Sequence, residues 1–197
     1  LKRRRVRNSN ILNMNKHNLT PLKMPFKKGE TIETMITLNV NTGFKLFDYP
    51  VNYLLFNDKS MYVGESTQIK VRINDHLSNP KRSKFNEMIV LFENQFHQSA
   101  TFNIETNLIN YLLADGKYVL QNRSQIKQKT SHNYYNKNLY DKEIFSEIWD
   151  YLRTEKIAHN SLENLRNTDV FKLSPFKELS EEQISLKQDI IDFIKEN

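Results

Sequence analysis

The chain contains no cysteine, only four glycines and a single tryptophan among its 197 residues. The lack of cysteine excludes disulfides, thiolate catalysis and cysteine-bound zinc, so any metal site must use oxygen or imidazole ligands. No glycine-rich phosphate loop is present, and the chain therefore carries no ATPase motif of its own. No apolar run approaches the roughly 20 residues that span a bilayer, and no apolar secretory signal occurs. These absences predict a cytoplasmic protein.

The composition is that of a folded protein with a polar, basic surface. Hydrophobic residues make up 38% of the chain and charged residues 26%, which excludes wholesale disorder. The formal net charge of +6 favours a polyanionic partner, because Lys and Arg that neutralise phosphates gain affinity by releasing counterions. A membrane surface would also attract a basic chain, but no basic amphipathic helix is found for that purpose. Nucleic acid is the expected partner.

Two apolar segments joined by a turn predict a β-hairpin near the middle of the chain. Residues 50–56 are rich in strand-forming side chains, residues 57–59 are turn-prone, and residues 60–64 return to strand character. The continuous apolar run 88–92 has the pattern of a strand buried on both faces, a pattern that a helix fragment shares. Taken as a third strand, it completes a small three-stranded mixed or antiparallel sheet.

Helical spacing follows both the hairpin and the third strand. Apolar residues four apart predict a short helix between Ser66, a candidate N-cap, and Pro80. A longer helix is predicted from residue 101 to residue 114, with Gly116 as its stop. The predicted fold is therefore α/β (α+β), with a small sheet flanked by helices.

The remaining sequence divides into two flanking regions. A helix is predicted from about residue 140 to residue 156, and Ser180 with Gln183 forms a capping box ahead of a last helix. That helix ends in mid-pattern, which suggests that the segment belongs to a larger protein. The predicted organisation is a basic, asparagine-rich extension over 1–45, a compact domain over 46–125 and a helical connector over 126–197.

Charged residues on the two predicted helices are the candidates for chemistry. Arg72 and His76 lie four residues apart, on a face that does not carry the apolar residues. An exposed helix face with an incidental arginine is the alternative. Glu105 shares its helical face with three apolar residues, and a buried carboxylate costs several kcal/mol unless it is paired or bound to a cation. Either a metal ion or an ion pair with Arg72 would meet that need, and both place Glu105 near Arg72.

Two strand-end segments, Val51-Asn52-Tyr53 and Tyr62-Val63-Gly64, precede four polar residues: Arg72, His76, Glu105 and Asn122. This order and approximate spacing resembles the GIY-YIG endonucleases, a family named for two short strand motifs that begin a compact α/β domain. The resemblance covers roughly residues 49 to 122. Val51 replaces the customary glycine of the first motif and Asn52 the usual aliphatic residue, whereas Tyr53 is retained.

The resemblance implies a role for each of these residues in cleaving phosphodiester bonds. Glu105 would be the sole protein ligand of Mg²⁺ or Mn²⁺, an arrangement that suits an ion keeping several waters. Arg72 would contact the scissile phosphate. Tyr62, or failing it Tyr53, would help position or deprotonate the attacking water. The remaining residues of the signature would have supporting roles. His76 would assist proton transfer or be a structural histidine, and Gly64 and Asn122 would brace the site.

Basic residues near this site are expected to contact nucleic acid. Lys81, Arg82 and Lys84 follow Pro80 in a loop that could track a phosphate backbone, and Lys70 lies on the first helix. A solvated loop is the alternative for the three charges in the loop. Among the aromatic residues of the connector, we expect core packing rather than base stacking for three: Tyr134, Tyr135 and Tyr140.

Segment 169–183 is similar to the lead-in of bacterial DNA/RNA helicases that carry amino-terminal GIY-YIG domains. This similarity implies that a P-loop motor follows, with a role in DNA processing or phage defence. The expected activity is therefore metal-dependent cleavage of DNA, with RNA not excluded as a substrate. Two alternatives remain: a catalytically silent module that binds nucleic acid for the helicase, and a protein-interaction domain of a defence complex.

Overall fold

A five-stranded sheet forms the centre of the protein, a computed structural model that describes residues 18–42, 46–122, 133–172, 185–186, 189 and 192–193. The spatial order of the strands is β1-β4-β2-β3-β5. Their bounds are Thr20–Pro25 for β1, Val51–Phe56 for β2, Ser60–Ser66 for β3, Glu87–Phe92 for β4 and Val119–Leu120 for β5. All pairs are antiparallel except β3 with β5. The predicted three-stranded sheet is thus wrong in strand number, because β1 and β5 extend it on both sides.

The predicted hairpin is confirmed as β2 and β3. Asn57 closes the turn, since its side-chain oxygen accepts hydrogen bonds from the backbone of Lys59 and Ser60. The predicted third strand is confirmed as β4, which pairs with β2 on the side away from β3. All six residues of β2 are buried, as expected of a strand that has neighbours on both edges and helices on both faces.

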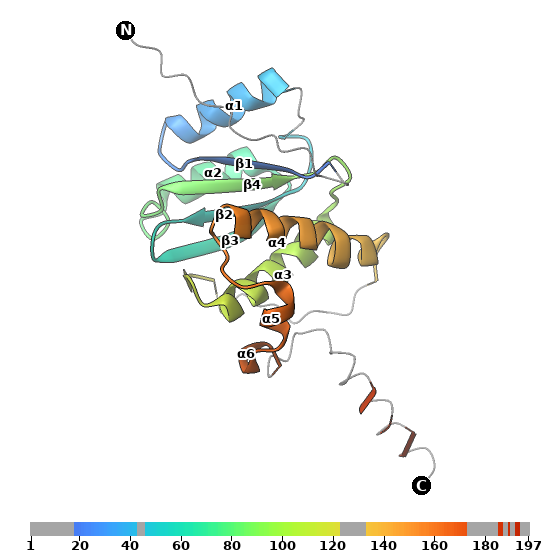
Figure 1. Cartoon of the computed structure of the whole chain (residues 1–197). Coiled ribbons are helices and arrows are strands. Elements are labelled where there is room, and N and C mark those ends of the chain that lie inside the picture. The colour runs from blue at the N-terminus through green and yellow to red at the C-terminus, as the bar shows by residue number, and fades with distance from the viewer. Residues whose placement is uncertain are drawn as a thin grey trace.

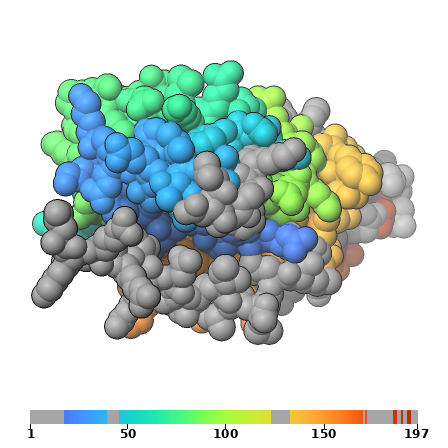
Figure 2. Space-filling model, turned by 90° about the horizontal axis from the view of Figure 1, so that it is seen from above, coloured from blue at the N-terminus to red at the C-terminus, as the bar shows by residue number. Residues whose placement is uncertain are grey.

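Helices cover both faces of this sheet (Figure 1). On one face, α1 (Glu30–Thr42) and α2 (Ile69–Ser78) contribute Met35, Ile69 and Ile73 to a core with the odd-numbered residues of β2. Seen from above in Figure 2, the blue residues of α1 lie at the surface of this face. On the other face, α3 (Gln98–Asp115) packs with Leu54 and Val63. The predicted helix between Ser66 and Pro80 is confirmed as α2, but its N-cap is Gln68 rather than Ser66, whose hydroxyl accepts from the backbone nitrogen of Gln68. The predicted helix over 101–114 is confirmed as α3, and Gly116 ends it with φ 71°.

The described parts of the two flanking regions pack on this same framework. Within 1–45, β1 pairs with β4 along six residues, and α1 follows it. Within 126–197, α3 is covered by a π-helical turn η2 (Leu139–Ile144) and by α4 (Phe145–Thr154), α5 (Leu162–Arg166) and α6 (Asp169–Lys172). The predicted helix over 140–156 corresponds to η2 and α4.

The aromatic residues of the connector divide in two. Tyr140 is buried and Tyr134 packs against the core, as predicted, whereas Tyr135 is 81% exposed, so its predicted core position is wrong. The capping box of Ser180 and Gln183 and residues 173–183 of the helicase-like segment lie outside the described residues. No helix within the described part of the chain has the length and apolar character needed to cross a membrane.

Candidate active site

The two tyrosines of the family-like motifs lie side by side on one face of the sheet. Tyr53 pairs with Gly64 and Leu55 pairs with Tyr62 across the hairpin. Since directly opposite residues point to the same face and alternate residues share a face, Tyr53, Gly64 and Tyr62 all face α2. The ring centroids of Tyr53 and Tyr62 lie 6.2 Å apart, and both side chains are buried.

Gly64 leaves the space that Tyr53 occupies. A β-carbon at position 64 would overlap Cζ and the hydroxyl oxygen of Tyr53 and would lie 2.9 Å from Cε1. Because any side chain there would displace the ring, glycine at position 64 allows Tyr53 to reach across β3 toward α2.

Arg72 joins the two tyrosines. Its Nε donates to the hydroxyl oxygen of Tyr53 at 3.2 Å, and one terminal nitrogen donates to the hydroxyl of Tyr62 at 3.4 Å. The bond to Tyr53 is the main cause that raises the pKa of Arg72, so the guanidinium stays charged. The side chain is exposed although its tip contacts two buried phenols. The fork geometry of arginine suits this double contact, which a single ammonium could not reproduce.

His76 completes the cluster on the inner side. Its Nε2 lies 2.8 Å from the hydroxyl of Tyr53, and the residue is only 5% exposed. Burial, and then the positive charges of Arg72 and Arg82, lower the pKa of His76 to about 4, so the ring is neutral at neutral pH. Tyr53 accepts from Arg72 and must place its own buried proton on an acceptor. Neutral Nε2 of His76 is that acceptor, which puts the His76 proton on Nδ1.

The hydroxyls of Tyr53 and Tyr62 therefore differ in their hydrogen-bond partners. Burial, followed by the nearby Tyr62, raises the pKa of Tyr53, and its proton is engaged with His76. Tyr62 accepts from Arg72, and it also forms a side-chain hydrogen bond with Tyr53. Tyr53, which contacts Arg72, His76 and Tyr62, therefore holds the cluster together.

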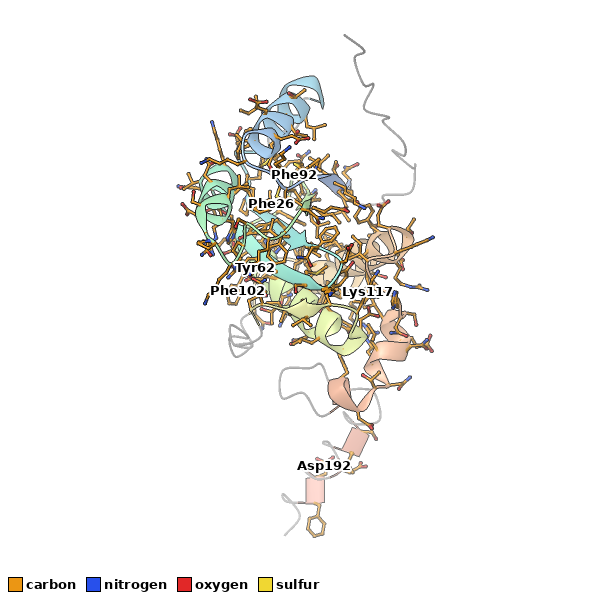
Figure 3. The ribbon with its side chains drawn as sticks, turned by 90° about the vertical axis from the view of Figure 1, so that its left-hand side faces the viewer. Phe26, Tyr62, Phe92, Phe102, Lys117 and Asp192 are labelled. Atoms are coloured by element: carbon orange, nitrogen blue, oxygen red, sulfur yellow. The ribbon has the colours of Figure 1, made fainter. Side chains whose placement is uncertain are left out.

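Glu105 lies on α3, which covers the opposite face of the sheet from α2. The side chain is half-buried rather than enclosed, so burial alone does not require it to have a partner. Thr101, one helical turn earlier, contacts Glu65 of β3 with 3.5 Å between oxygens. This contact joins the first turns of α3 to the end of β3, and Glu105 lies one helical turn further along α3. In Figure 3, Tyr62 and Phe102, which precedes Glu105 by three residues, lie on the same side of the molecule.

Two buried asparagines link these elements. Asn122 donates from Nδ2 to the carbonyl of Val63 at 2.8 Å. This bond extends the pairing of β5 with β3 beyond the last residue of β5. Asn52 donates from Nδ2 to the carbonyl of Thr101 at 2.8 Å, which joins β2 to the first turns of α3. The side-chain oxygens of both are buried without a hydrogen-bond partner. Asn122 braces the strand next to Gly64, the kind of contact expected of it.

The basic residues predicted to bind nucleic acid have different positions. Lys70, Lys81 and Lys84 are exposed, as a phosphate-contacting surface requires. Arg82 is instead half-buried, with Cζ of its guanidinium 3.5 Å from the centroid of the Tyr62 ring. Arg82 thus belongs to the cluster formed by Tyr53, Tyr62, Arg72 and His76. Its spacing in the sequence did not indicate this position.

The site thus contains two phenols, two guanidiniums and a neutral imidazole, an arrangement suited to an anionic ligand. Within the described residues, no group of three or more His, Asp and Glu side chains could hold a metal ion. Comparison with models of known protein families, with curated proteins and with solved structures found no significant match.

Proposed function

We propose that this protein is a metal-dependent endonuclease of the GIY-YIG type that hydrolyses phosphodiester bonds in DNA. The observation that carries the proposal is the double contact of Arg72 with the hydroxyls of Tyr53 and Tyr62. The family resemblance implies that these three residues act together. Their hydrogen-bonded cluster supports that implication, because nothing in the sequence spacing alone requires the two phenols to share one guanidinium.

In this mechanism, Arg72 and Tyr62 act on the phosphate and the attacking water. The exposed part of the Arg72 guanidinium offsets the charge that develops on the phosphate oxygens in the transition state. In this step Tyr62 acts as a phenolate: it orients the water, takes its proton and becomes a neutral phenol, and the resulting hydroxide attacks the phosphate. The Arg72 guanidinium lies 3.4 Å from the Tyr62 oxygen, where it can pair with the phenolate. Tyr53 and His76 hold Arg72 from the buried side, since Tyr53 accepts from its Nε and donates to Nε2 of His76.

The oxygen groups beside β3 suit Mg²⁺ or Mn²⁺. Glu105 lies on α3 one helical turn after Thr101, which contacts Glu65 of β3. On the same strand, the Val63 carbonyl accepts from Asn122, whose Oδ1 is buried without a partner. Glu105 would hold the ion, and magnesium prefers oxygen ligands of this kind together with retained waters. When bound, the ion would polarise the phosphate and stabilise the leaving oxygen.

A second candidate function is a catalytically silent module that binds DNA with the same fold. The observation that favours it is the first motif, where Val51 and Asn52 replace the family residues and are fully buried. Asn52 uses its amide to join β2 to α3. This part of the motif serves packing and leaves the contribution of Tyr53 to the site unchanged.

Nicking of plasmid and single-stranded DNA with Mg²⁺ or Mn²⁺ tests the proposal. Native protein should cleave, and both Glu105→Gln and Arg72→Lys should lose activity by at least about 100-fold, the effect of removing one transition-state contact. Matched controls are Glu33→Gln and Arg153→Lys, which make the same changes at exposed positions on α1 and α4. Both controls should cleave like the native protein.

The outcomes separate the candidates. If native protein binds DNA but does not cleave it with any metal, the enzyme proposal is wrong and the silent module stands. If cleavage survives Glu105→Gln, the protein is a nuclease but the assignment of Glu105 as the metal ligand is wrong.

A further inference from the structure

The turn that follows α2 is rigidly built. The backbone nitrogens of Arg82 and Ser83 both donate to the carbonyl of Asn79, and the nitrogen of Lys81 donates to the Asn79 side chain. The nitrogen of Phe85 donates to the carbonyl of Arg82, and Phe85 itself is 2% exposed. The predicted basic loop is therefore an ordered turn anchored in the core, in which Lys81 and Lys84 are exposed, and it fixes the backbone from which the Arg82 side chain extends.

From this turn, the Arg82 side chain covers one face of the Tyr62 ring. The distance of 3.5 Å from Cζ to the ring centroid is van der Waals contact, closer than most cation–π pairs require. The His76 ring packs against the same ring in a T-shaped arrangement, with 5.0 Å between centroids, and Arg72 donates to the Tyr62 hydroxyl. One continuous segment, from residue 72 to residue 82, thus supplies three contacts to Tyr62: one over its ring face, one T-shaped ring contact and one at its oxygen.

Within the described residues, no hydrogen bond or ion pair draws the Arg82 side chain away from Tyr62. No ion pair with a described Asp or Glu is present, and Nη1 is buried without a hydrogen-bond partner. A buried guanidinium nitrogen that lacks an acceptor costs free energy, which a purely structural arginine would avoid by turning toward solvent. The arrangement favours contact with the Tyr62 ring over the solvation of that nitrogen.

We infer that Arg82 is a positioning residue that holds the Tyr62 ring in the orientation in which its hydroxyl meets Arg72. This inference rests on the proposed function for its effect on cleavage, but its physical content, immobilisation of the ring, is independent of cleavage. A ring that loses one wall flips more easily about its Cβ–Cγ axis, which leaves its oxygen in place but reports the looser packing. The same loss of packing lets the whole side chain swing about the Cα–Cβ bond, which carries its oxygen away from Arg72. Misplacement of a reacting group by about 1 Å can cost about 100-fold in rate.

Two measurements on full-length Arg82→Ala and Arg82→Lys variants test the inference. The first is the flipping rate of the Tyr62 ring by NMR relaxation dispersion, which should rise in Arg82→Ala and rise less in Arg82→Lys. The second is steady-state cleavage, in which kcat should fall by roughly 10- to 100-fold in Arg82→Ala and by less in Arg82→Lys, with KM within about threefold. The controls, Arg153→Ala and Arg153→Lys, change an exposed arginine on α4 and should alter neither quantity.

The results distinguish this inference from the proposed function. An unchanged flipping rate would overturn the role of Arg82 whether or not the protein cleaves DNA. A raised KM with unchanged kcat would also overturn it, because Arg82 would then be a DNA-backbone contact. Faster flipping in Arg82→Ala together with an inactive native protein would support the positioning role and reject the nuclease. If Arg82→Ala does not fold, Arg82→Lys alone decides by the same criteria.

Discussion

The ring of Tyr53 fills the space in which a side chain at position 64 would lie. The two residues face each other across β2 and β3, and a β-carbon on Gly64 would overlap the Tyr53 hydroxyl. That hydroxyl bonds both Arg72 and His76. The glycine of the second motif and the tyrosine of the first are therefore parts of one steric arrangement.

Gly64→Ala should destabilise the protein by about 2 kcal/mol, the usual cost of overpacking a filled core, and should reduce cleavage. Urea unfolding measures the first effect. A double-mutant cycle provides the control: in a Tyr53→Leu background the ring is gone, so Gly64→Ala should cost less than about 1 kcal/mol. An equal cost in both backgrounds would show that the contact with Tyr53 is not the cause.

Arg72→Lys should separate rate from stability. A lysine ammonium can replace one of the two bonds to the tyrosines but not the fork, so we expect kcat to fall by at least about 100-fold. Because the Arg72 side chain is exposed, Tm should change by less than about 2 °C. Parallel kinetics and thermal melts check this. A large fall in Tm would indicate that Arg72 serves the fold and that any rate loss is secondary.

The buried His76 should make stability depend on pH. Its pKa is about 4 in the folded protein, against about 6.5 when unfolded. The unfolded chain therefore binds a proton that the folded chain does not between these values, so stability is full above about pH 6.5 and falls as pH drops toward 4. The loss should be on the order of 3 kcal/mol.

Urea unfolding between pH 4 and pH 7.5 measures this effect, with His76→Gln as the comparison. Glutamine offers an acceptor to Tyr53 but does not titrate, so the variant should lose less stability on acidification than the native protein. Identical pH dependence in the two proteins would contradict the assignment of the His76 pKa.

Sequence patterns identified the elements that depend on local spacing. The hairpin followed from its turn residues, and α2 and α3 followed from apolar periodicity and the stop at Gly116. The edge strand β1 was missed because Pro21 and Pro25 interrupt its pattern, although both tolerate an edge position. β5 has only two residues, too few for any periodicity to show.

The candidate site could be predicted in part. The i, i+4 spacing of Arg72 and His76 placed them on one helix face, and both contact Tyr53. Glu105 is half-buried, although its helical face carries three apolar residues. Because α3 is packed between the sheet and the connector and is buried on most sides, an apolar face on this helix does not single out one carboxylate. Arg82 was placed with its neighbours in the loop, since its contact with Tyr62 depends on the fold of a turn rather than on spacing.

Substitution of Asn52 tests whether this residue of the first motif serves folding stability or cleavage activity. The residue is fully buried, its Nδ2 donates to the carbonyl of Thr101, and its Oδ1 lacks a partner. That carbonyl also lies in position to accept the intrahelical bond from the nitrogen of Glu105. Asn52→Val removes a bond worth about 1 kcal/mol but also a buried unsatisfied oxygen that costs about 1–3 kcal/mol.

We therefore expect Asn52→Val to raise stability by about 1 kcal/mol and Tm by about 3 °C. Cleavage should fall severalfold, because the amide ties β2, beside Tyr53, to the helical turn that leads to Glu105. Thermal melts and kcat measure the two effects. Asn52→Asp is the contrasting variant, since it keeps the shape but replaces the donor with a buried charge, and it should be strongly destabilised. A lower Tm for Asn52→Val would mean that the bond to Thr101 outweighs the unpaired oxygen, and Asn52 would then be retained for stability rather than for the placement of Glu105.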